Sequence, residues 1–181
     1  MKASINTTYG SPEVLHIMDV EKPTLKNNEI LIKVHATTVN RTDCGFRKPE
    51  APFIIRPIHG LINPKRRILG SELSGVVEAI GKDVTSFKIG DKVFGLSTFL
   101  FGAHAEYICM DENRSIVHMP LNISYEEAAA VCDGAFLALA NIKKIDFSTK
   151  PKILVNGESG SIGTACVQLA HYYGAEVTAV C

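Results

Sequence analysis

Three glycines near the C-terminal end of the chain, Gly157, Gly160 and Gly163, are spaced three residues apart. A short apolar run, 153–155, precedes them, and a helical pattern of apolar residues follows as far as Gly174. Glycine lets a backbone approach a diphosphate closely, and the amides at the start of the next helix then face the phosphate charge. The spacing therefore predicts a dinucleotide-binding turn between a strand and a helix.

Three residues inside this turn are candidates for ligand contact: Ser159, Ser161 and, through its backbone amide, Ile162. The alternative is that the glycines only allow the strand and the helix to pack tightly. The turn lies in a strand–helix–strand unit, 152–181, of the length typical of a Rossmann nucleotide-binding unit. Because a complete Rossmann sheet needs more strands, we expect this domain to be incomplete here.

The composition limits the class of protein. The 181 residues are 46% hydrophobic, and 19 Lys and Arg balance 19 Asp and Glu, which suits a buried core and does not predict a nucleic-acid partner. No apolar run approaches the ~20 residues of a membrane span, and the N-terminus lacks a signal-peptide pattern, so we expect a cytoplasmic protein. Five scattered cysteines without a Cys-x-x-Cys pair argue against a structural zinc site or a disulfide framework.

The elements that must position this chemistry begin with a β-rich region, 1–122. The segment 30–37 has a period of two, as in a strand with one buried face: one face would carry Ile30, Ile32, Val34 and Ala36, and the other Leu31, Lys33, His35 and Thr37. Further strands are predicted at 73–80, from Lys92 onwards and at 103–110.

Residues 45–69 are rich in proline and basic residues and have little periodicity, which predicts a long loop. The second region, 123–181, opens with a helix, because Ser124 and Glu127 have the spacing of a capping box before a run of alanines. We expect this helix to end near Ile142 and to lead into the nucleotide-binding unit.

Five motifs occur in the order and at the spacing of one protein family. The patterns are VNxxDxxxR, LGxExxGVVxxVG, FKxGDxVxG, GxxAEY and AxxGxxG. In this chain they correspond to Val39–Arg47, Leu69–Gly81, Phe87–Gly95, Gly102–Tyr107 and Gly157–Gly163. On these motifs, which extend over essentially the whole chain, it resembles the medium-chain dehydrogenase/reductase superfamily, in its zinc-free, quinone oxidoreductase-like branch.

The resemblance implies a β-rich GroES-like barrel domain, 1–122, followed by the first part of an α/β Rossmann domain. In that second part, 123–181 form the linking helix and the first strand–helix–strand unit of an incomplete NAD(P)-binding domain. The resemblance also implies an N-terminal fragment of a longer, homodimeric enzyme, with NADP(H) favoured over NAD(H). That enzyme would transfer a hydride to a quinone or an α,β-unsaturated carbonyl compound, and we expect the 181-residue fragment alone to be inactive.

The zinc-dependent branch of the family holds its catalytic metal through three side chains. By the resemblance, Asn40, Ser71 and Asp133 occupy those positions here. Zinc binds thiolate, imidazole or carboxylate groups, and an amide and a hydroxyl are not normal ligands. We therefore expect no zinc, and a small-molecule substrate whose acceptor carbon is already electrophilic. A relative of the zinc-type alcohol dehydrogenases is the alternative.

Asn40 is the candidate catalytic residue, because its side-chain amide could bond the cofactor or the substrate; the alternative is a turn residue that ends a strand. Phe46, Arg47 and Tyr107 are candidate substrate-binding residues. For Arg47 the alternative is a pairing with Asp43 that braces the loop, and for Tyr107 it is a place in the core or at its rim.

Asp133 is a candidate cofactor-contacting residue, although its charge is negative, and Leu137 stands where the family often has a threonine. The segment 49–64 could form a wall of the substrate pocket. Two alternatives to an enzyme stay open. One is a non-catalytic family member that binds a nucleotide or a protein partner, and the other is a short gene product that acts by domain pairing and not by catalysis.

Overall fold

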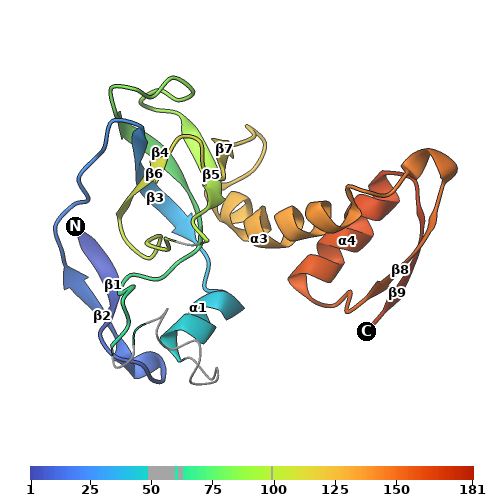
Figure 1. Ribbon diagram of the computed structural model, residues 1–181, viewed down its shortest axis with the longest axis horizontal. Coiled ribbons are helices and arrows are strands. Elements are labelled where there is room, and N and C mark those ends of the chain that lie inside the picture. The colour runs from blue at the N-terminus through green and yellow to red at the C-terminus, as the bar shows by residue number, and fades with distance from the viewer. Residues whose placement is uncertain (49–59, 61–62, 99) are drawn as a thin grey trace. The chain divides into compact units, whose positions relative to one another are not determined.

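The computed structural model describes residues 1–48, 60, 63–98 and 100–181. The chain divides into two compact units, Met1–Ala129 and Ala130–Cys181 (Figure 1). The division lies inside the helix α3 (Tyr125–Ile142), whereas the sequence-based division after residue 122 lies just before that helix. None of the helices in the described ranges combines the length and the apolar character that a membrane crossing needs.

The first unit is built on a five-stranded antiparallel sheet in the order β6-β3-β4-β5-β7 (Figure 1). Its strands are β3 (Glu29–Thr37), β4 (Glu72–Ile80), β5 (Lys92–Leu96), β6 (Tyr107–Asp111) and β7 (Ile116–His118). This unit corresponds to the β-rich region that the sequence predicts over 1–122.

Apolar residues of neighbouring strands form the core of this sheet. They are almost completely buried and include Ile30, Ile32, Leu73, Val77 and Val93. Burying side chains of this size contributes roughly 1.5–3 kcal/mol each. The strands predicted at 30–37, at 73–80 and from Lys92 onwards are confirmed, and together they form the frame on which the site is built.

The strand predicted over 103–110 begins later, because β6 starts at Tyr107. The segment before it makes other hydrogen bonds. Ala103 N donates to Gly70 O at 3.1 Å, and His104 N donates to Leu69 O at 2.9 Å. Residues 103–104 are thus tied to the loop before β4 and not to the edge of β3.

Two strands that the sequence did not predict pair near the N-terminus, β1 (Lys2–Asn6) and β2 (Leu15–Asp19), with the short 3-10 helix η1 (Pro12–Val14) between them. Isolated bridges join β1 to Ala105 and to Ile68. The β1–β2 hairpin therefore lies beside the segment before β6 and the loop before β4, which are also hydrogen-bonded to each other.

A short helix, α1 (Arg41–Arg47), follows β3. The loop predicted over 45–69 is therefore wrong at its start, because residues 45–47 are helical. The helix begins with an Asn-x-x-Asp capping pattern at Asn40 and Asp43, which was the local signal for it. Most of the remaining segment, 49–59 and 61–62, lies outside the described residues, and so does most of the proposed pocket wall over 49–64.

Helix α3 begins as predicted, because Ser124 and Glu127 form a capping box. Glu127 N donates to Ser124 Oγ at 3.2 Å, and Ser124 N donates to Glu127 Oε2 at 2.8 Å. The helix also ends at Ile142, as expected.

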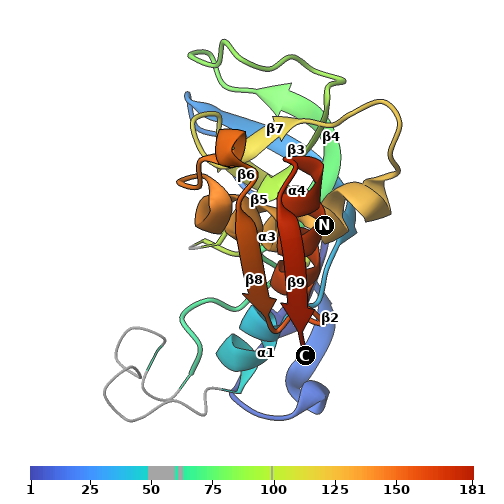
Figure 2. The same cartoon turned by 90° about the vertical axis from the view of Figure 1, so that its right-hand side faces the viewer.

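The predicted strand–helix–strand unit follows α3 and is confirmed. After the 3-10 helix η2 (Phe147–Thr149), the chain forms β8 (Lys152–Asn156), α4 (Ser161–Tyr172) and β9 (Glu176–Val180). Strands β8 and β9 pair in parallel, and Figure 2 shows them side by side.

Candidate active site

Helix α1 begins at Asn40, whose side chain caps it. The amide oxygen accepts a hydrogen bond from Asp43 N at 3.1 Å, and the Asp43 carboxylate accepts one from Asn40 N at 3.0 Å. This reciprocal cap satisfies backbone groups that would otherwise lack a partner at the helix start. Asn40 therefore has a defined structural role where β3 ends and α1 begins.

The amide nitrogen of Asn40 faces the start of β4. It donates to Ser71 Oγ and to Glu72 Oε2, each at 2.9 Å. Both of its hydrogens and one lone pair of its oxygen are then used within the protein. The amide can still offer a ligand the second lone pair of that oxygen.

Glu72 is a buried carboxylate, only 4% exposed. Thr38 Oγ1 donates to the same Oε2 atom that Asn40 contacts, and Thr37 Oγ1 donates to the Glu72 carbonyl oxygen at 2.7 Å. A buried charge is tolerated only where donors surround it. These bonds join the end of β3 to the start of β4, so Asn40, Ser71 and Glu72 form one connected polar network.

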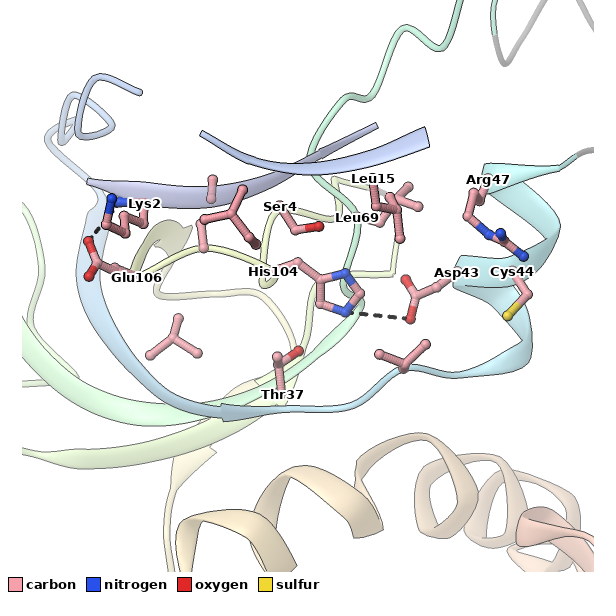
Figure 3. Close-up of a pocket in the computed structure, with 15 residues that line it drawn as sticks. Lys2, Ser4, Leu15, Thr37, Asp43, Cys44, Arg47, Leu69, His104 and Glu106 are labelled. Atoms are coloured by element: carbon pink, nitrogen blue, oxygen red, sulfur yellow. Dashed lines mark hydrogen bonds and ion pairs between the residues drawn. The ribbon is translucent and has the colours of Figure 1, made fainter. Parts of the chain in front are cut away.

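Asp43 is a second buried carboxylate and contacts two loops as well as α1. Its Oδ1 accepts a hydrogen bond from Gly70 N at 2.9 Å, and its Oδ2 lies 3.9 Å from His104 Nε2 (Figure 3). The His104 Nε2–H donates to Thr38 O at 2.8 Å. Gly70 has a φ of 92°, and a Cβ there would lie 2.6 Å from His104 Cδ2, so this approach needs glycine.

Arg47 does not pair with Asp43, the alternative that the sequence left open. Its Nη1 atom is buried without a hydrogen-bond partner in the described part of the chain. Arg47 and Asp43 instead both line a cavity of about 460 Å³, together with Cys44 and His104 (Figure 3). Asn40 does not line this cavity.

The two aromatic candidates for substrate binding have protein partners of their own. The ring of Phe46 packs against Phe101 at a centroid distance of 4.5 Å. The Lys22 ammonium lies 3.7 Å from the centroid of the Tyr107 ring, a distance typical of a cation–π contact. Tyr107 pairs with Lys33 within β3, whereas α1 follows the end of that strand. The structure therefore does not bring Tyr107 to the network at α1.

The glycine turn, residues 157–163, connects β8 to α4. Gly157 has a φ of 82°, which favours glycine, and a Cβ there would meet no atom within 4 Å, so its backbone is open to a ligand. At Gly163 a Cβ would lie 2.2 Å from Gly157 O, so the helix could not pack against the turn there. The turn thus combines the two roles that the sequence left as alternatives for its glycines: a backbone open to a ligand, and tight packing of the helix against the turn.

Gly160 directly precedes helix α4 and, having no side chain, forms no side-chain cap. The first N–H groups of the helix, those of Ser161, Ile162 and Gly163, precede the first helical bond, from Thr164 N to Gly160 O at 2.8 Å, and so lack a helical acceptor. Such N–H groups attract an anion.

The side chains predicted around the turn lie in different surroundings. Ser159 is exposed. The Ser161 hydroxyl instead lies against α3, because a Cβ on Gly134 would be 2.3 Å from Ser161 Oγ. Asp133 is half-buried and precedes Gly134 in that helix, so α3 contributes residues close to the start of α4.

No three His, Cys, Asp or Glu side chains gather into a possible metal site among the described residues. At Asn40 and Ser71, two of the positions that correspond to zinc ligands by the resemblance, the Asn40 amide donates one N–H to Ser71 Oγ. An amide nitrogen that donates hydrogen bonds is not a zinc ligand.

Comparisons with known proteins agree with this architecture. The family description "Alcohol dehydrogenase GroES-like domain" matches residues 26–121. The chain is 35% identical to a quinone oxidoreductase of Sus scrofa over 93% of its length, and 33% identical to a 2-methylene-furan-3-one reductase of Solanum lycopersicum over 99%. The structure of a quinone oxidoreductase from Coxiella burnetii superposes with a TM-score of 0.81 at 29% identity, covering 99% of this chain and 56% of that one.

The chain therefore belongs to the alcohol dehydrogenase GroES-like family, within the medium-chain dehydrogenase/reductase superfamily and among its quinone oxidoreductase-like members. It spans about half the length of the curated relatives it matches, 49% of the Sus scrofa protein and 46% of the Solanum lycopersicum one. This share is consistent with the predicted N-terminal fragment.

Two participants in the polar network were missed at the level of sequence, Thr38 and His104. His104 lies in the Gly-x-x-Ala-Glu-Tyr motif, but at a variable position of the pattern. Its contact with Thr38 joins residues 66 positions apart, and no local spacing could have indicated it.

Proposed function

We propose that the chain is part of an NAD(P)H-dependent oxidoreductase that transfers a hydride to a quinone or an α,β-unsaturated carbonyl compound without zinc. The observation that carries the proposal is the glycine turn at 157–163, with an open backbone at Gly157 and, at the start of α4, amides that lack a helical acceptor. The relatives named quinone oxidoreductase and 2-methylene-furan-3-one reductase support the acceptor class.

The residues at this turn fit the diphosphate of a dinucleotide. The N–H groups of Ser161, Ile162 and Gly163 supply donors, and the missing side chain at Gly157 leaves room for close approach. When bound, the nicotinamide supplies the hydride. NADP(H) remains the favoured form, as the family resemblance implies.

Independence from zinc is supported by the chemistry of the donors around Asn40. Its amide hydrogens are bonded to Ser71 and Glu72, and its oxygen caps α1. Asn40 therefore acts first as a positioning residue that holds β3, α1 and β4 together. We propose that its remaining oxygen lone pair, and not a metal, is what this part of the protein presents to a bound ligand.

The proposal is tested with the whole polypeptide as the cell makes it. We expect it to oxidise NADPH in the presence of quinones and enones, and added chelator should leave the rate unchanged. Simple alcohols serve as the comparison substrates. Turnover of alcohols that depends on bound zinc, with none of the quinones or enones reduced, would refute the proposal. NADPH binding without turnover of any acceptor would instead favour a non-catalytic nucleotide-binding protein.

Three further predictions remain: the protein is a homodimer, its main ligand besides the cofactor is an electrophilic small molecule, and its location is cytoplasmic. Light scattering of the whole polypeptide would measure the oligomeric state. The substrate roles of Phe46, Arg47 and Tyr107 and the cofactor role of Asp133 are likewise proposals. Of these four residues, Arg47 has the strongest support, because it lines a cavity with a buried nitrogen that has no partner.

A further inference from the structure

Glu158 lies inside the glycine turn and is fixed to the first turn of α4. Its carbonyl oxygen accepts a hydrogen bond from Thr164 Oγ1 at 2.7 Å. A Cβ on Gly163 would lie only 2.5 Å from the Glu158 Cα. The backbone of Glu158 is thus held against the start of α4.

One of the two carboxylate oxygens of Glu158 lacks a compensating donor in the described part of the chain. Its Oε2 atom is buried and has no hydrogen-bond partner among the described residues. The unpaired N–H groups of Ser161, Ile162 and Gly163 are near in the sequence, yet none of them bonds to the carboxylate. A partly buried anion without a donor keeps more of its field than an exposed one, because water screens it less.

We propose that Glu158 sets the affinity of this turn for its ligand by opposing the negative charge of the diphosphate. The inference rests on the proposed function, because it concerns the same dinucleotide site. The start of α4 attracts an anion, and Glu158 adds a like charge beside it. Two like charges a few ångströms apart in a partly buried site repel more strongly than they would in water. The turn therefore binds its ligand more weakly than its glycines alone would allow.

The test compares two neutral substitutions with a matched control in the whole polypeptide. Glu158→Gln keeps the shape of the side chain and removes the charge, and Glu158→Ala removes both. Glu176→Gln is the control, since Glu176 is exposed and pairs with Lys152 at the opposite end of β8. Titration calorimetry with NADPH and, separately, with inorganic pyrophosphate measures the dissociation constants, and thermal melting checks that each variant is folded.

We expect both Glu158 variants to bind NADPH and pyrophosphate about tenfold more tightly than the wild type at low salt. The gain should shrink to about twofold near 0.5 M NaCl, because salt screens the repulsion. The Glu176→Gln control should bind as the wild type does.

Equal affinity of wild type and both Glu158 variants would overturn this inference and leave the proposed function intact. Weaker binding by Glu158→Gln would also overturn it, because the carboxylate would then contact the ligand favourably. A tighter variant whose gain does not change with salt would show that charge is not the cause. If no folded protein in the set binds NADPH or pyrophosphate, the inference and the proposed function fail together.

Discussion

The substitution Asn40→Asp tests whether the polar network holds the site together as the hydrogen bonds indicate. In the wild type, the amide nitrogen donates to Ser71 Oγ and Glu72 Oε2 at 2.9 Å each. The introduced carboxyl can still cap α1 through the oxygen that accepts from Asp43 N. It loses both donors, however, and places an oxygen next to the buried Glu72 carboxylate.

The cost follows from the distance between the two groups. Two unit charges about 3 Å apart repel by roughly 5–6 kcal/mol at an effective dielectric constant of about 20. The introduced carboxyl can escape this by keeping its proton, and keeping it at pH 7 costs about 4 kcal/mol for a group with an ordinary pKa near 3.9. The protonated group regains part of this through one hydrogen bond to Glu72. We therefore expect a loss of about 3 kcal/mol at pH 7.

The loss should depend on pH with a definite sign. The pKa of the introduced carboxyl is raised in the folded state, so the folded state binds a proton that the unfolded state releases. Stability relative to the wild type then rises as the pH falls below the folded pKa toward the unfolded pKa of about 3.9. At pH 5 the cost of keeping the proton is only about 1.5 kcal/mol, so the deficit should shrink to roughly 0.5 kcal/mol.

Urea denaturation at pH 7 and at pH 5 measures both values, with Asn40→Ser as the control. Serine also caps a helix but carries no charge, so its loss should be about 1–2 kcal/mol and the same at both pH values. An Asn40→Asp deficit that does not change between pH 7 and pH 5, or that equals the Asn40→Ser deficit at pH 7, would refute the reasoning.

Two further predictions concern other parts of the chain. Gly163→Ala should destabilise the protein by about 1–3 kcal/mol in urea denaturation, because the new methyl would lie 2.2 Å from Gly157 O. The control is Gly45→Ala in α1, which should not destabilise the protein, because a Cβ there meets no atom within 4 Å. Equal losses of stability in the two variants would contradict the argument. Burial raises the pKa of the Cys109 thiol to about 11, so at pH 7.5 iodoacetamide should modify the exposed Cys44 well before Cys109, and mass spectrometry of the digested protein would detect the opposite order.

The parts of the fold that local patterns encode were predictable. The capping box at Ser124 and Glu127 is a four-residue signal, and α3 begins where it indicates. The alternation over 30–37 likewise gave β3, because one face of that strand packs into the core. The glycine spacing likewise located the turn before α4. All three of these signals depend on residues that are close together in the sequence.

The parts of the site that depend on distant contacts were not predictable. Asn40 could be singled out by its residue type, but its bonds to Ser71 and Glu72 span 31 and 32 positions. The Asn-x-x-Asp cap of α1 was visible in the sequence, but Asn40 was interpreted as a catalytic residue or a turn residue, and no helix was predicted there. The charge of Glu158 within the glycine turn was also visible, but only the structure shows that one of its oxygens is buried without a partner.

The position of Asp43 has a consequence for how the site assembles. A single carboxylate joins the start of α1 to Gly70, 27 residues later, and lies beside His104, farther along still. Closing such long loops costs chain entropy before any contact repays it. Helix α1 is too short to persist alone, so we expect it to become ordered only after the surrounding sheet has brought those segments together. We therefore expect the site to form late in folding, and an opening that frees the loop at Gly70 should also destabilise the helix.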